Sequence, residues 1–136
     1  MGRDQESLTI LPSTARAVRT TSADIRNPGY AGGIFTFDVT LNASTAVSPR
    51  FFVQGRVPGT TATYYSIGVV GAVSTSTADG VRRMVVYPGI STASASTVGV
   101  VEQELISQPL PYIFRITSTA SSTGTITYSA SVDLVG

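Results

Sequence analysis

No cysteine, histidine or lysine occurs among the 136 residues of this sequence. Without cysteine there is neither a disulfide framework nor a thiolate metal site, and without histidine the commonest general base and metal ligand are missing. A serine nucleophile would have only a carboxylate to activate it. The eight carboxylates are scattered along the chain rather than paired as glycoside hydrolysis requires. We therefore expect a protein that is not an enzyme and that has no cofactor and no metal site.

Charge of either sign is also scarce. Only 12% of the residues are charged, and nine arginines against eight carboxylates leave a formal net charge of +1. This balance provides neither a basic stripe for nucleic acid nor an acidic field. About a quarter of the residues are serine or threonine, so the surface of an isolated monomer would carry unusually little charge. Composition thus disfavours a nucleic-acid partner and favours assembly into an oligomer.

Long hydrophobic runs are absent as well. No segment approaches the roughly 18 apolar residues of a membrane span. The N-terminus carries acidic residues where a signal peptide needs basic ones, and the apolar run Leu8 to Leu11 is too short for a signal-peptide core. We expect the protein to be made in the cytoplasm and not to associate with a membrane.

A chain of this length is expected to form one domain. The first residues are polar, and the short apolar run Leu8 to Leu11 that follows ends at Pro12. We interpret residues 1–14 as an N-terminal arm and residues 15–136 as a single β-sandwich domain. Because a short apolar segment that follows a polar one has little to pack against, we expect the arm to contact the strand edge of a neighbouring subunit through Leu8, Ile10 and Leu11.

Alternation of apolar and polar residues predicts β-strands along most of the chain, most cleanly from Ile34 to Leu41. Two aromatic and β-branched runs flank Pro58-Gly59 within residues 49–73, which predicts a hairpin. Residues 98–106 suit either a strand or a short helix, and the strand is favoured. We interpret residues 112–117 and 125–135 as a closing hairpin.

About eight strands with regularly spaced turns and no convincing helix predict an all-β fold, an antiparallel β-sandwich that is jelly-roll-like. In each strand one set of alternate residues is apolar, and these sets should pack against one another between the sheets. The expected core consists of Phe35, Phe37, Val39, Phe51, Val53, Phe114, Ile116, Ile126, Tyr128 and Val132.

Candidate contact residues lie on the predicted strands. Arginine without lysine suits bidentate ion pairs at a protein interface, and Phe52 stands among polar neighbours. The strand residues expected at an interface are Arg50, Phe52, Arg56, Arg82 and Arg83. Two alternatives remain open: Phe52, Tyr64 and Tyr65 as a platform for sugar stacking, and Glu102 with Glu104 as calcium ligands. Cross-strand packing and a solvated strand edge are favoured over these.

Several short motifs follow one another in a defined order along the chain. They are Val53-Gln54-Gly55-Arg56-x-Pro58 with Tyr64-Tyr65-x-Ile67, then Val86-Tyr87-Pro88-Gly89, Leu110-Pro111 before Phe114-Arg115-Ile116, and Tyr128-Ser129. In this order, from Thr14 to Val135, the chain resembles small virion structural proteins of tailed bacteriophages.

The resemblance implies a capsid decoration, or cement, protein. Such a protein would be made in the host cytoplasm and sit on the capsid surface of the virion, where it bridges capsid subunits. Its implied partners are the major capsid protein and its own copies, which we expect to form a homotrimer. A tail or head-tail junction subunit is one alternative, and a carbohydrate-binding β-sandwich module is another. The resemblance carries no catalytic residue.

Overall fold

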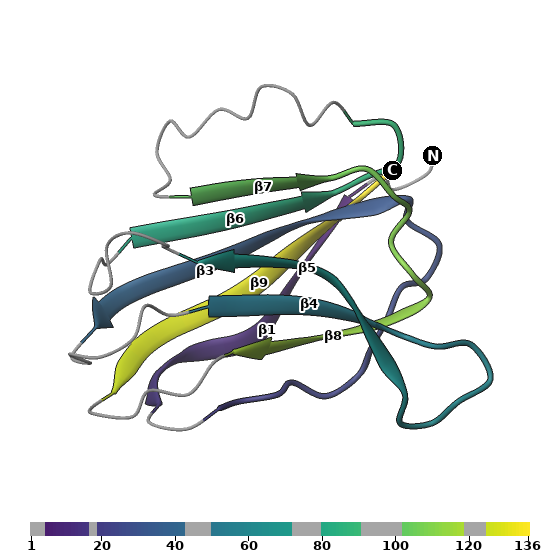
Figure 1. Cartoon of the computed structure of the whole chain (residues 1–136). Coiled ribbons are helices and arrows are strands. Elements are labelled where there is room, and N and C mark those ends of the chain that lie inside the picture. Colours follow the sequence, from purple (N-terminus) through teal and green to yellow (C-terminus); the bar gives the residue numbers. More distant parts are fainter. Residues whose placement is uncertain (1–4, 17–18, 43–49, 72–79, 91–101, 119–124) are drawn as a thin grey trace.

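The computed structural model describes residues 5–16, 19–42, 50–71, 80–90, 102–118 and 125–136. These ranges contain nine strands and no helix, which confirms the expected all-β fold (Figure 1). The strands are β1 (Gln5–Arg16), β2 (Ile25–Arg26), β3 (Gly32–Asn42), β4 (Arg50–Arg56), β5 (Tyr64–Gly71), β6 (Gly80–Val86), β7 (Glu102–Ile106), β8 (Ile113–Ser118) and β9 (Ile126–Val135).

The strands form a sandwich of a five-stranded sheet, in the order β1-β9-β3-β6-β7, and a four-stranded sheet, in the order β2-β8-β4-β5. Antiparallel pairs are nested along the chain: β1 with β9, β2 with β8, β3 with β6, and β4 with β5. Only the pairing of β6 with β7 is parallel among the described strands. This nested order is compatible with a jelly roll, in which a long folded ribbon wraps around one core.

The core lies between the two sheets, and every residue expected there is buried. The alternation is strictest in β9, where buried and half-buried residues follow one another along the whole strand. Aromatic rings join the two sheets. The ring of Phe37 stacks on that of Phe51 with centroids 4.7 Å apart, and Phe51 meets Tyr128 edge-on at 4.9 Å. These contacts combine apolar burial with favourable ring geometry.

The N-terminal segment differs from the expected arm. From Gln5 onward the residues of the supposed arm belong to β1, which pairs with β9 of the same chain from Gln5↔Val135 to Arg16↔Ile126. Leu8, Ile10 and Leu11 are half-buried and pack against this chain's own core. These side chains are thus partly covered by this chain itself, and the expected free arm is corrected to a strand of the sandwich.

Among the described strands β1 is an edge of the five-stranded sheet, and this edge is poorly suited to accept another strand. Its register shifts between Thr9 and Leu11 and again between Leu11 and Thr14, and Pro12 lacks a backbone N–H. Arg16 fastens the irregular part, because its Nη2 donates to the carbonyl of Pro12 at 2.6 Å and its Nη1 to that of Tyr128 at 2.7 Å. Bulges and proline are the devices that protect sheet edges from unwanted pairing.

The predicted closing hairpin is wrong. β8 lies in the four-stranded sheet between β2 and β4, whereas β9 lies in the five-stranded sheet between β1 and β3. The chain therefore crosses from one sheet to the other between these strands, and the hydroxyls of Ser118 and Tyr128 hydrogen-bond across the core at 2.6 Å. The expected strand within 98–106 is confirmed for Glu102–Ile106, while residues 98–101 lie outside the described ranges.

The loop between β2 and β3 is organised by Asn27, which is 4% exposed. Its side-chain oxygen accepts hydrogen bonds from the backbone N–H groups of Gly29 and Tyr30, which forms an Asx-turn. Its side-chain nitrogen donates to the carbonyl of Tyr30 at 2.8 Å and to that of Leu110 at 3.4 Å. Asn27 thereby ties this loop to the segment that leads into β8.

Candidate interaction surface

An apolar pair lies on the outer face of the four-stranded sheet. Phe52 of β4 and Val69 of β5 are cross-strand partners, and Phe52 is half-buried while Val69 is 40% exposed. Arg50, two residues before Phe52 on the same face, is exposed. We call Arg50, Phe52 and Val69 the Phe52–Val69 patch. A partly exposed apolar pair beside an arginine has the composition of a protein contact surface.

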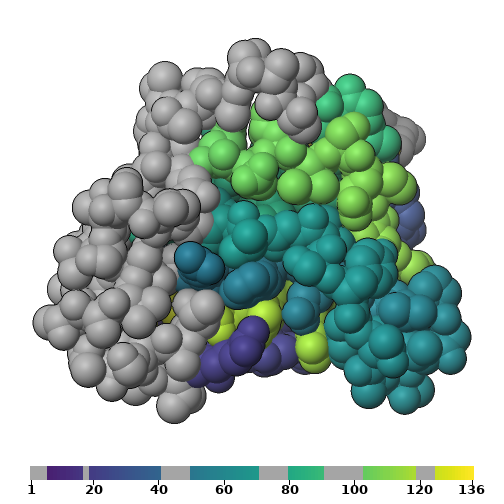
Figure 2. Space-filling model, viewed as in Figure 1, coloured from purple at the N-terminus to yellow at the C-terminus, as the bar shows by residue number. Residues whose placement is uncertain are grey.

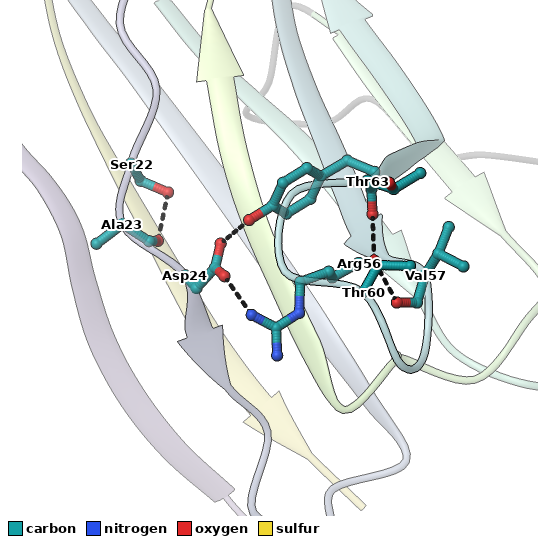
Figure 3. A network of polar contacts seen from close by, with 8 residues as sticks. Ser22, Ala23, Asp24, Arg56, Val57, Thr60 and Thr63 are labelled. Atoms are coloured by element: carbon teal, nitrogen blue, oxygen red, sulfur yellow. Dashed lines mark hydrogen bonds and ion pairs between the residues drawn. The ribbon is translucent and has the colours of Figure 1, made fainter.

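A polar network continues along the same face towards the β4–β5 turn (Figure 3). The carboxylate of Asp24 accepts a hydrogen bond from the Tyr64 hydroxyl at 2.6 Å and pairs with Nη1 of Arg56 at 3.0 Å. Cζ of Arg115 lies 3.5 Å from the centroid of the Tyr64 ring, and Nε of Arg115 donates to Oε1 of Gln54 at 2.8 Å. Three strands and the segment before β2 are thus joined by charge-assisted contacts.

Strand register explains why these side chains meet. Arg56 pairs with Tyr64 across β4 and β5, and Gln54 pairs with Arg115 across β4 and β8, so all four share one face. Asp24 reaches them because it directly precedes β2, which pairs with β8. The Asp24–Arg56 pair is partly exposed, so its main effect is to orient the Arg56 guanidinium rather than to stabilise the fold.

The titration of Tyr64 tests this network. The hydrogen bond to Asp24 raises the pKa of the Tyr64 phenol above its ordinary value; partial desolvation and the charge of Asp24 add to this, and Arg115 and Arg56 oppose it. Asp24→Asn should therefore lower the pKa of Tyr64, and Arg56→Gln should raise it. The tyrosinate absorbance of each protein, minus that of its Tyr64→Phe counterpart, measures the shift.

The sign of the associated pH dependence follows from the raised pKa. The hydrogen bond favours the protonated phenol in the folded protein, so its contribution to stability is complete below the ordinary pKa of tyrosine. It is lost as pH rises through the raised folded-state value. A Tyr64 titration that is the same with and without the Asp24 carboxylate would contradict the network.

A groove opens beside this network, where β4 ends and the chain enters β8. It has a volume of about 450 Å³ and is lined by Arg56, Pro58, Gly59, Tyr65, Pro111, Tyr112 and Ile113. We call it the Tyr65–Tyr112 groove. One wall is the β4–β5 turn, which projects from the body of the sandwich in Figures 1 and 2. Tyr65 is 40% exposed and Tyr112 is 59% exposed.

The turn that forms this wall is closed by its own hydrogen bonds. The backbone N–H of Val57 donates to the carbonyl of Thr63 at 2.9 Å, and the Thr60 hydroxyl donates to that of Val57 at 2.7 Å. Gly59 has a φ of 81°, a conformation that residues with a side chain rarely adopt. Pro58-Gly59 therefore forms the turn expected from the sequence, in a defined conformation.

The residues expected at an interface do not form one cluster. Arg50, Phe52 and Arg56 share the outer face of the four-stranded sheet, whereas Arg83 lies on the five-stranded sheet, where its Nε donates to Oε1 of Gln103 at 2.6 Å. Arg82 is fully buried and is corrected as a contact residue. Neighbouring residues of a strand point to opposite faces, and Arg82 shares the inner face with Met84 and Val86.

Several surface residues were not anticipated from the sequence. Asp24 and Tyr112 come from segments far from the central hairpin, and Gln54 and Arg115 are joined only by the register of β4 with β8. The one available signal was the sequence Pro109-Leu110-Pro111-Tyr112, where prolines hold the chain extended at the start of β8. Tyr112 directly precedes β8 and lines the groove.

The described residues contain no group of three or more His, Cys, Asp or Glu side chains that could hold a metal ion. Glu104 is half-buried in β7, and the side chain of Glu102 is outside what the structure describes. Within the same ranges there is no helix with the length and apolar character needed to cross a bilayer.

No protein-family model matches the chain, and no curated protein matches it significantly. Among solved structures, one titled as infectious bursal disease virus, Gx strain, is similar with a TM-score of 0.40 and 15% identical residues. The similarity covers 97% of this chain and 32% of that chain, so this chain spans about a third of the viral protein's length. A TM-score of 0.40 carries no functional argument.

Proposed function

We propose that the chain is a structural protein of a virus particle, and more specifically a decoration, or cement, protein that binds the outside of a phage capsid. The observation that carries the proposal is the Phe52–Val69 patch, a partly exposed apolar pair with an arginine on the outer face of the four-stranded sheet. Apolar centres with arginine at their margin are typical of protein interfaces. The ordered motifs shared with small phage virion proteins support the same assignment.

The architecture suits a protein that bridges subunits. Its core is continuous between two sheets, and an apolar aromatic stack connects them, so the outer faces keep a fixed orientation. A contact as small as the Phe52–Val69 patch is weak by itself. Many copies on one shell, or one oligomer that engages several shell subunits at once, convert weak contacts into strong stabilisation. We propose the major capsid protein as the partner and a homotrimer as the bound form.

The patch is tested by placing a charge in it. Purified protein is added to particles that were made without it. Val69→Glu should lower the occupancy that the protein reaches by about tenfold or more, because the contact would bury an unpaired carboxylate. The fold should survive, since Val69 is 40% exposed in the isolated chain. Quantitative electrophoresis of washed particles measures the occupancy, and a density map of the intact particle locates the protein.

Thr9→Glu is the matched control, because Thr9 is an exposed strand residue of the other sheet, in β1. It should leave occupancy unchanged. Equal occupancy of the Val69→Glu and unmodified proteins would remove the patch from the interface. Density on the tail or at the head-tail junction, with none on the capsid, would replace the cement assignment with that of a tail or junction subunit.

A further inference from the structure

The exposed aromatic surface of the described residues gathers in one place. Three large hydrophobic side chains are exposed in the described ranges, Tyr65, Val69 and Tyr112, and both tyrosines line the Tyr65–Tyr112 groove. Tyr65 belongs to β5 and Tyr112 directly precedes β8, so the fold, and not adjacency in sequence, brings the two rings together. Two partly exposed rings in a concave site offer flat apolar faces to a ligand.

The groove is rigid on both sides. Tyr65 packs against the backbone at Gly55, where a Cβ would lie 2.6 Å from Cζ of Tyr65 and 3.0 Å from Cγ of Pro111. The opposite side is anchored through Leu110, whose N–H donates to the carbonyl of Ala31 at 2.9 Å. A ligand therefore meets a preformed site, which reduces the entropy lost on binding.

The groove is poorly equipped to bind a peptide through its backbone. Adding a strand requires a row of free backbone N–H and C=O groups. Pro58 and Pro111 line the groove and have no N–H, and the N–H of Val57 is already bonded to Thr63. Recognition must therefore come from ring faces and side-chain donors. A saccharide is recognised in this way, because its C–H groups stack on aromatic faces and its oxygens accept hydrogen bonds.

The charge around the groove selects an anion. Arg56 lines it directly, and Cζ of Arg26 lies 5.2 Å from the centroid of the Tyr112 ring. Arg115 lies on the neighbouring Tyr64 ring, and the carboxylate of Asp24 pairs with Arg56. Of the guanidinium nitrogens of Arg56, only Nη1 contacts Asp24 within the described ranges. A guanidinium has five N–H donors, and the remaining ones suit a ligand carboxylate.

We propose that the Tyr65–Tyr112 groove binds an acidic saccharide, with a sugar ring on a tyrosine face and the sugar carboxylate paired with Arg56. The volume of about 450 Å³ lies in the range of small-ligand pockets and suits a ligand of about one or two sugar rings. Asp24 is a positioning residue, since it holds the Arg56 guanidinium at the groove. This binding activity is separate from attachment to a shell, because the groove and the Phe52–Val69 patch share no residue.

The test is a calorimetric titration of the full-length protein with galacturonic, glucuronic and N-acetylneuraminic acids and with digalacturonate, and with neutral galactose as the uncharged counterpart. At least one acidic sugar should bind, about tenfold or more tightly than galactose. Arg56→Gln should remove this preference for the acid, whereas Tyr112→Ala should weaken the acidic and neutral sugars alike by about tenfold. High salt should weaken the acidic sugar in the unmodified protein and not in Arg56→Gln.

Val69→Ala is the matched control, because Val69 is exposed to the same extent as Tyr65 and does not line the groove. It should leave saccharide affinity unchanged. The proposal is overturned if none of the acidic sugars binds at millimolar concentration, or if Tyr112→Ala and Val69→Ala reduce affinity equally. It is also overturned if a proline-rich peptide binds the groove and no sugar competes with it. Loss of capsid attachment without loss of sugar binding would affect only the proposed function.

Discussion

Phe37→Ala should lower the free energy of unfolding by about 3 to 5 kcal/mol. Phe37 is fully buried, and its ring stacks on Phe51 of the opposite sheet at 4.7 Å with an interplanar angle of 8°. The substitution removes both the transfer free energy of the ring and the contact between the sheets, and it leaves a cavity that a sandwich built from two sheets fills only partly. Urea denaturation followed by tyrosine fluorescence or far-UV circular dichroism measures the change.

Phe37→Leu is the control for this prediction. It keeps most of the apolar volume and removes the aromatic stacking, so it should cost about 1.5 kcal/mol or less. If alanine and leucine destabilised the protein equally, the stability at this position would come from the ring contact and not from filled volume. If Phe37→Ala cost less than 1 kcal/mol, the burial of this side chain between the sheets would be contradicted.

The period of the hydrophobic pattern was a reliable guide to the core. Every residue chosen for it by alternation is buried, because a strand residue's face depends only on its position modulo two. The same rule explains Arg82. Its charge suggested the surface, but it lies two residues from Met84 on the inner face, and the pattern was the better guide.

The pattern could not identify pairing partners. It describes β8 and β9 equally well as a hairpin and as strands of different sheets, and only the fold distinguishes these arrangements. The pairing of Gln5 with Val135 joins the two ends of the chain, and nothing local to either end predicts it. The N-terminal strand was therefore interpreted as an arm, although its residues cover the core beside β9.

The part of the candidate surface that comes from one hairpin was predictable from the sequence. Arg56, Tyr64 and Tyr65 belong to one hairpin whose turn is evident from Pro58-Gly59, and their proximity follows from the strand register. Asp24 and Tyr112 reach the same region through the pairing of β2 with β8 and the extended approach to β8. Such a site is assembled from distant segments, so its composition depends on the topology of the four-stranded sheet.

The groove and the patch also differ in how they relate to stability. The Phe52–Val69 patch is formed by residues whose neighbours are strand partners, so a change there acts mainly on the surface. The groove is built on Gly55, where the Tyr65 ring occupies the space of a side chain. A larger residue at that position would displace the ring and alter binding together with local packing.

Gly32→Ala should destabilise the protein by about 1 to 3 kcal/mol or more, because it adds volume where the backbone of a neighbouring strand leaves no space. Gly32 is buried at the start of β3, and a Cβ there would overlap the carbonyl oxygen of Val86 and lie 2.6 Å from Cδ2 of Tyr87. Backbone cannot move aside as a flexible side chain can. The pairing of Gly32 with Val135 and of Gly33 with Val86 would have to shift.

Gly68→Ala separates this steric effect from the general consequences of replacing a strand glycine. Neither Gly32 nor Gly68 has a positive φ, so alanine reduces the entropy of the unfolded chain similarly at both positions, which favours folding by about 0.4 to 1 kcal/mol. At Gly68 the atoms nearest to the new Cβ would be side-chain atoms of Ile106 and Met84, at 3.1 to 3.3 Å, and these can adjust. Chemical denaturation should therefore show Gly68→Ala within about 1 kcal/mol of the unmodified protein and Gly32→Ala well below it. Equal stabilities of the two variants would mean that β3 and β6 approach each other less closely at Gly32 than described.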